Sequence, residues 1–235
     1  MIQLYNIILF QPLLNLLVWL YNMIGDIGVA IIIVTILIRF VLLPLSLKSM
    51  KSQQSLQGLQ PKMDEIKNKF KDDKQKQSEE LMKFYKENKI NPMSSCLPLL
   101  VQLPIIFALY GVFQKGLQNS SMDLLYSFVS KPESINPMLF GLVSMTTPNL
   151  ILAIIAGLLQ FVQSWMVFSK QKKTSDKMAG MLGKQMTYFM PVMTVFIAMS
   201  LPAGLAIYWI TTTLFAIAQQ YIMTKKTGVS GVTAA

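Results

Sequence analysis

The chain has 235 residues, of which 53% are hydrophobic and only 14% are charged, and its mean hydropathy is positive. This composition excludes an ordinary water-soluble domain and predicts one polytopic membrane domain, because ~20 mainly apolar residues suffice for a helix to cross a bilayer. Cys96 is the only cysteine, which excludes a disulfide framework, and the chain has no histidine, the usual general base and zinc ligand. We therefore expect no metal, no cofactor and no enzymatic activity.

The N-terminal segment, residues 1–25, is uncharged, but polar residues and a proline interrupt it: Gln3, Asn6, Gln11, Pro12, Asn15 and Asn22. Because of these interruptions we expect an amphipathic helix, centred on residues 13–24, that lies in the membrane interface instead of crossing the bilayer. No Lys or Arg precedes the apolar stretch, so the positive region of a cleaved signal peptide is not expected.

The first span is predicted over residues 27–47, between Asp26 and Lys48. Residues 48–89 then hold eleven lysines against seven acidic residues, so this part lies outside the hydrocarbon. Apolar side chains recur there at steps of three and four on both sides of the polar stretch "KDDKQKQ". The pattern predicts a cytoplasmic hairpin of two antiparallel helices.

Four more spans are predicted from uncharged apolar stretches, over residues 92–113, 149–168, 185–200 and 205–223. The last two are divided by "LPAG", in which Pro202 and Gly204 are expected to form a turn. The connection 114–148 has no net charge, whereas the loop 169–185 holds five lysines and one aspartate. Lysine-rich loops mark the cytoplasmic side. This places the N-terminus outside and the tail, residues 225–235, in the cytoplasm.

Arg39 lies within the apolar run "IIIVTILIRFVLLPL" and is the only arginine of the chain. At ~1.5 Å per residue it is roughly 13 Å from Lys48, which is too deep for easy snorkelling. A charge at such depth costs ~2.5–3.5 kcal/mol or more and usually faces a bundle interior or a wet cavity. Guanidinium keeps its proton, so Arg39 predicts a permanent positive charge beside water. Two plainer interpretations stay open: contact with headgroups or backbone carbonyls, and a helix end kinked by Pro44.

Other polar side chains are predicted at compatible depths in the spans: Thr35, Gln102, Gln160, Gln163, Thr211, Thr212 and Thr213. Together with Arg39 they fit the lining of one cavity, although each alone is also typical of hydrogen bonds between membrane helices. Tyr208 and Trp209 fit either an aromatic belt at the interface or the same lining. No Asp or Glu lies inside a predicted span, so a client could supply the anion that Arg39 lacks.

Several stretches agree with one known family in order and spacing: "LLPLSLKSMKS", "NPMSSCLPLLVQLPIIFALY" and "FMPVMTVFIAMSLPAGLAIYWITTTLFAIAQQ". Over about residues 1–225 the chain resembles a minimal bacterial form of the YidC membrane protein insertases, relatives of the Oxa and Alb proteins. The resemblance implies an all-α core over residues 26–224, with five transmembrane helices around a hydrophilic groove. It also implies Arg39 as the positive charge of the groove, Thr35 one turn away, and three wall positions: Gln102, Gln163 and Trp209.

The expected function is that of a membrane protein insertase and chaperone in the bacterial plasma membrane. Its expected partners are the lipid bilayer and nascent membrane proteins with short acidic or polar translocated segments. Contact with the Sec translocon and with the ribosome is left open by the sequence, and no sequence-specific nucleic acid is expected. The tail lacks the long basic extension that some members use to hold ribosomes, so such contact is expected at the loop 169–185 and the hairpin 48–89. The hairpin is also expected to be mobile and to help recruit clients.

Three other classes stay open. A small anion channel or transporter would use Arg39 for selectivity and needs a path to both faces of the membrane, although the chain shows no inverted repeat. A passive assembly scaffold would tolerate the loss of Arg39 if the hairpin were kept. Intramembrane proteolysis fits least, because the predicted spans hold neither a histidine nor paired aspartates. The sequence also lacks the phosphate-binding pattern G-x-x-x-x-G-K-[ST] of nucleotide-driven machines.

Overall fold

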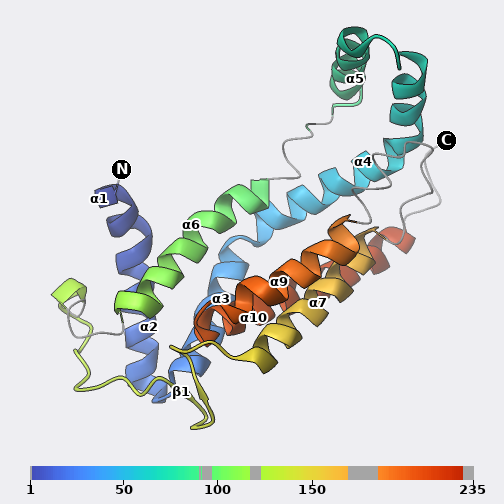
Figure 1. Cartoon of the computed structure of the whole chain (residues 1–235). Coiled ribbons are helices and arrows are strands. Elements are labelled where there is room, and N and C mark those ends of the chain that lie inside the picture. Colours follow the sequence, from blue (N-terminus) through green and yellow to red (C-terminus); the bar gives the residue numbers. More distant parts are fainter. Residues whose placement is uncertain (1, 90, 92–96, 117–122, 169–184, 230–235) are drawn as a thin grey trace.

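The computed structural model describes residues 2–89, 91, 97–116, 123–168 and 185–229, and most of them are helical (Figure 1). A short antiparallel hairpin pairs β1, Met138–Leu139, with β2, Val143–Ser144. The helices are α1 Ile2–Tyr5, η1 Asn6–Phe10, α2 Gln11–Ile24, α3 Ile27–Val41, α4 Leu43–Lys69, α5 Lys74–Glu87, α6 Leu97–Gly111, η3 Val112–Gly116, α7 Leu150–Phe168, η5 Gln185–Phe189, α9 Met190–Met199 and α10 Ala203–Val229, where η marks a π-helical turn.

By length and composition, two helices of the described chain are able to cross a membrane, Asn6–Ile24 and Leu150–Phe168. The bent pair α3 and α4 adds a third if it forms one span, while Leu100–Gln114 and Gln185–Met199 are shorter apolar helices. The predicted span 149–168 therefore coincides with a helix, α7. The number of five spans stays a prediction.

The stretch predicted as the first span, residues 27–47, is bent within its length, in line with the interpretation that Pro44 kinks the helix end. α3 ends at Val41 and α4 begins at Leu43, and the two axes differ by 62°. Pro44 favours the break, because it cannot donate a backbone hydrogen bond to the preceding turn, and it lies in the first turn of α4, where that N–H is not needed. The apolar run therefore bends three residues after Arg39 instead of running straight to Lys48.

The predicted helical hairpin is present as α4 and α5, which lie against each other and extend away from the other helices (Figure 1). The turn falls at residues 70–73, where Asp73 caps α5 by accepting a hydrogen bond from the backbone N–H of Lys76 (2.9 Å). Phe70 closes the turn beneath the ammonium groups of Lys69 and Lys76, at 5.5 and 5.7 Å from its ring.

The polar residues of the N-terminal helix are used for contacts within the protein. Asn15 is buried, and its side chain forms hydrogen bonds with the backbone of Leu124 and Tyr126. The side chains of Gln11 and Asn22 likewise donate to the backbone carbonyl oxygens of Leu124 and Ser130. These residues suggested an interfacial helix, but their polarity does not by itself require water. The interfacial position stays a prediction beside the finding that Asn6–Ile24 is long enough to span.

The β1–β2 hairpin fixes the end of the bundle at which α3, α7 and α10 begin, here called the hairpin end. Asp26 caps α3 through Val29 N (3.0 Å) and accepts a second hydrogen bond from Phe140 N (2.6 Å). Leu139 packs so closely on Gly28 that a Cβ there would lie 2.5–2.9 Å from it. The part of the predicted connection 114–148 that forms this hairpin is therefore an integral part of the fold.

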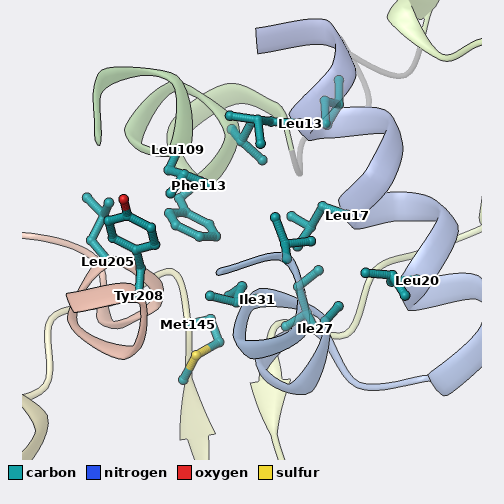
Figure 2. Packing of buried hydrophobic residues seen from close by; sticks show 14 of the residues in the cluster. Leu13, Leu17, Leu20, Ile27, Ile31, Leu109, Phe113, Met145, Leu205 and Tyr208 are labelled. Atoms are coloured by element: carbon teal, nitrogen blue, oxygen red, sulfur yellow. The ribbon is translucent and has the colours of Figure 1, made fainter. Parts of the chain in front are cut away.

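The apolar core joins α2, α3, α6 and α10 near the hairpin end. Figure 2 shows side chains from these helices and from η3 directed toward one another, among them Leu13, Leu17, Ile27, Ile31, Leu109, Phe113, Leu205 and Tyr208. Other apolar side chains stay exposed, for example Ile151 at 69% and Leu158 at 62% on α7. Such exposure is unfavourable in water, so we assign this face to lipid.

Packing between α7 and α9 gives a prediction about stability. A methyl group at Gly157 would collide with the side chain of Val195 and lie 3.1 Å from the carbonyl oxygen of Pro191, whereas nothing lies within 4 Å at Gly58 of α4. Because valine is stiff in a helix, Gly157→Ala should cost about 1–3 kcal/mol and lower the melting temperature in detergent.

Gly58→Ala is the matched control and should leave the melting temperature equal or slightly higher, by the helix propensity of alanine. Equal melting temperatures for the two variants would contradict the close α7–α9 packing.

Candidate polar site around Arg39

Arg39 lies in the last turn of α3, beside the break at Leu42, and its side chain is half-buried. Its Nε donates to Thr212 Oγ1 of α10 (3.4 Å), and its Nη2 donates to Gln102 Oε1 of α6 (3.1 Å). Three helices that are far apart in the sequence therefore meet at one guanidinium. Arg39 bonds to side chains of other helices, so the interpretation based on backbone carbonyls is not supported by these contacts.

Gln102 continues the hydrogen-bond chain from the arginine to an aromatic residue. Its Nε2 donates to the hydroxyl oxygen of Tyr208, so both ends of the amide are used. The ring of Tyr208 is 3% exposed and lies beside Phe113 and Leu205 in the apolar core, with its hydroxyl at the edge of the cluster (Figure 2). Tyr208 is therefore held by packing. Because the guanidinium group of Arg39 can only donate, it turns the oxygen of Gln102 toward itself and leaves the amide N–H for the tyrosine hydroxyl.

The two bonds of Arg39 use one edge of its guanidinium group. Nε and Nη2 lie on the same side of the planar group, which is one of the two edges that can bind a carboxylate with two hydrogen bonds. Here that edge is taken by the neutral oxygen atoms of Thr212 and Gln102. Within the described residues the recorded ion pair is Lys131 with Asp123, and no carboxylate pairs with Arg39. The positive charge is thus held in place without being neutralised.

The other predicted site residues are not linked to Arg39 by hydrogen bonds in the described part of the chain. Thr35 is buried and donates to Ile31 O of its own helix (2.6 Å), and Gln160 donates to Ser164 Oγ, also within one helix (3.5 Å). Gln163 and Trp209 are half-buried. Their place in a cavity lining stays a prediction.

The structure places Pro202 in the break between α9 and α10, as expected, but Gly204 lies outside it. The break covers residues 200–202, and Gly204 lies in the first turn of α10, where its N–H donates to Met145 O (2.9 Å). A Cβ at this position would lie 3.0 Å from the ring of Phe113. Glycine is needed there for close helix packing, and no turn conformation requires it.

A second polar link between helices was not anticipated from the sequence. Gln219 of α10 is buried and donates to Ser46 Oγ of α4 (2.7 Å), just beyond the break that follows Arg39. Glutamine in the uncharged stretch 185–224 was a usable signal, but nothing in the sequence pattern identified Ser46 as its partner.

The comparisons with known proteins agree on one family. A family model described as "60Kd inner membrane protein" matches residues 19–229, which is most of the chain. The chain belongs to this family.

Several members are similar over most of this chain. A protein of Fusobacterium nucleatum named membrane protein insertase YidC is 39% identical over 203 residues, which cover 86% of this chain and 88% of the relative. Proteins of the same name from Brucella melitensis and Francisella tularensis subsp. novicida are 35% and 34% identical over 93% and 88% of this chain. The matches cover only 36% and 34% of those two longer relatives.

One solved structure extends the family comparison to the fold. It is titled "Active YidC insertase crystal structure with the first transmembrane domain resolved", and it matches 92% of this chain with a TM-score of 0.63 and 28% sequence identity. The match covers 46% of that chain. The family is thus one of helical inner membrane proteins, and the resemblance found in the sequence motifs is confirmed.

The hydrogen-bond chain at Arg39 predicts an effect on stability. Gln102→Leu removes one acceptor from a half-buried cation and the donor to Tyr208. The free energy of unfolding should therefore fall by about 1–3 kcal/mol. Thermal unfolding in detergent measures this change.

Gln163→Leu is the matched control, because this half-buried glutamine has no recorded bond to Arg39, and its effect should be smaller. An equal or larger loss for Gln163→Leu would contradict the stabilising role of the bond between Arg39 and Gln102.

Proposed function

We propose that this chain is a membrane protein insertase. In this proposal a hydrophilic groove reaches part of the way across the membrane, receives the short polar flank of a nascent membrane protein, and lets the adjoining hydrophobic segment pass into lipid. Family membership and the names of the relatives support the general class. The observation that carries the mechanism is Arg39, a half-buried permanent cation whose recorded partners, Thr212 and Gln102, are neutral.

Arg39 would receive a client carboxylate on the edge that its neighbours leave available. Thr212 and Gln102 hold the Nε and Nη2 edge, which directs the Nη1 and Nη2 edge outward from the two helices that bind it. A carboxylate or a polar backbone carbonyl of the client can accept from this edge without displacing either neighbour. Tyr208 would act by positioning Gln102, since its hydroxyl receives the amide N–H.

The site lowers the cost of moving a polar flank into the membrane. A carboxylate loses most of its hydration when it enters hydrocarbon, which is unfavourable by many kcal/mol. A wet groove keeps part of that hydration, and a fixed positive charge offsets part of the remainder. The polar flank of the client would then have to cross only the part of the hydrocarbon layer that the groove does not reach.

The hydrophobic segment of the client would slide along the apolar helices toward lipid. Exposed apolar side chains on α7 and α9, such as Leu158 and Phe196, would provide the surface for this step. Partitioning into lipid would drive the release, and the membrane potential would add ~2.3 kcal/mol per client charge per 100 mV.

The charge pattern supports an orientation for this proposal. The lysine-rich hairpin 48–89 and the loop 169–185, most of which lies outside the described residues, would face the cytoplasm, with the N-terminus outside. The hairpin extends away from the bundle at the same end as the break after Arg39 (Figure 1). It is thus well placed to meet nascent chains, and it and the loop are the surfaces that we propose for contact with the ribosome or the Sec translocon.

Replacing Arg39 tests the charge directly. Arg39→Ala should reduce the insertion of clients with acidic translocated flanks by about tenfold or more, because a hydrogen bond to a charged group contributes ~1.5–3 kcal/mol. Arg39→Lys keeps the charge but loses the planar group with its two hydrogen-bonding edges. Its insertion defect should therefore be milder than that of Arg39→Ala. Insertion into proteoliposomes, scored by protease protection of the flank, is the measurement.

The control is the same client with its acidic residues changed to asparagine, which should depend less on Arg39. Equal insertion of both clients by Arg39→Ala would contradict the charge role. A chloride flux that requires Arg39 would instead favour the anion channel.

A second variant separates charge from packing. Gln102→Glu keeps the shape of the side chain but places a carboxylate against Arg39, so the internal ion pair should block acidic clients nearly as strongly as Arg39→Ala. Its melting temperature should stay close to that of the unmodified protein, because the bond to Arg39 is kept. Normal insertion of acidic clients by a folded Gln102→Glu variant would contradict the proposal that the uncompensated charge matters.

A further inference from the structure

The tip of the β1–β2 hairpin exposes two large apolar side chains that the proposed function does not use. Phe140 is 71% exposed and Leu142 is 81% exposed. They flank Gly141 at the point where the chain reverses between the two strands. Two such side chains on a tight loop are costly to hydrate, so their position calls for a partner.

Backbone hydrogen bonds tie the hairpin that carries the tip to the rest of the protein. Phe140 N donates to the carboxylate of Asp26 (2.6 Å), and Met145 N donates to Pro137 O (2.7 Å) across the base of the hairpin. The carbonyl oxygen of Met145 in turn accepts from Gly204 N of α10 (2.9 Å). These bonds tie the hairpin to the starts of α3 and α10.

At the tip, Phe140 adopts a backbone conformation that is unfavourable for a bulky residue. Phe140 has φ +48° and Gly141 has φ +71°. Glycine adopts positive φ freely, but a bulky residue does so rarely and at a cost. The contact between Phe140 N and Asp26 stabilises this conformation, and the conformation points the ring away from the bundle.

The surroundings of the tip favour lipid as its partner. From Ser134 to Ser169 the sequence holds no charged residue. The tip is therefore continuous along the chain with α7, whose exposed face begins at Leu150 and Ile151, 55% and 69% exposed. That face belongs to a helix long and apolar enough to cross the membrane. Phe and Leu side chains on the apolar face of segments that lie on a membrane are buried about 5–10 Å deep, at the boundary between headgroups and acyl chains.

We infer that Phe140 and Leu142 form a lipid anchor, which dips into the headgroup region of the leaflet at the hairpin end and sets the depth of that end. The anchor would act through the bonds of Asp26 and Gly204, so it would hold the starts of α3 and α10 at a fixed level. This inference does not depend on the insertase mechanism, because it concerns the resting protein in a bilayer without a client.

Fluorescence quenching in vesicles tests the inference. Cys96→Ser removes the single native cysteine, and Leu142→Cys or Phe140→Cys then carries an environment-sensitive NBD label. The proteins are reconstituted into vesicles of phosphatidylethanolamine and phosphatidylglycerol with nitroxide lipids. We expect a nitroxide near the headgroup to quench the label at least about twofold more than one near the end of the acyl chain. Glu133→Cys, exposed on the same connection, is the matched control and should be quenched mainly by iodide in water.

Quenching of the labels at 140 and 142 by iodide alone, as at 133, would overturn the anchor. Shielding from both lipid nitroxides and iodide that increases with the protein-to-lipid ratio would also overturn it, because it would identify a second copy of the chain as the partner. Leu142→Cys keeps the test valid if Phe140→Cys disturbs the bond to Asp26.

Discussion

The guanidinium group of Arg39 keeps its proton, and in the described part of the chain the fold surrounds it with neutral acceptors and no carboxylate. An internal ion pair would hold the side chain equally well but would neutralise it. Thr212 and Gln102 instead fix one edge of the group and preserve its charge. Tyr208 then fixes Gln102 from the apolar core. This arrangement explains why three helices from distant parts of the sequence must pack together at this level.

The two ends of α3 differ in what they contact. At its start, Asp26 bonds to both the helix and the β1–β2 hairpin, and α10 begins against the same hairpin. Near its end, Arg39 lies about 20 Å further along the helix, beside the break at Leu42 and close to the basic hairpin. Packed polypeptide thus holds one end of the bundle firmly, while the charged site lies toward the other. In the insertase that we propose, a client that approaches from the lysine-rich side would meet Arg39 without opening the end of the bundle that the β1–β2 hairpin holds.

The sequence was most informative where one physical requirement dominates. The length of the uncharged stretch over residues 149–168 identified α7. The lysine content of residues 48–89, together with apolar side chains at steps of three and four, identified the α4–α5 hairpin. Arg39 was identified by its charge alone, but its partners were not, since several polar residues had compatible depths and only packing selects Thr212 and Gln102. The N-terminal helix was interpreted from its polar residues, yet Asn15 bonds to a segment about a hundred residues later. Hydrogen bonds between residues so far apart in the chain cannot be inferred from a local sequence pattern.

The central claim is that an acidic client flank reaches Arg39 inside the membrane. Photocrosslinking measures this most directly, with the crosslinker at Trp209, one residue from Tyr208, and a control crosslinker at lipid-facing Leu158. A ribosome-stalled client with an acidic flank should crosslink through the flank at position 209, and much less when the flank is neutral or Arg39 is replaced. Flank crosslinks that are equally strong for acidic and neutral clients, or that form only at position 158, would contradict the account.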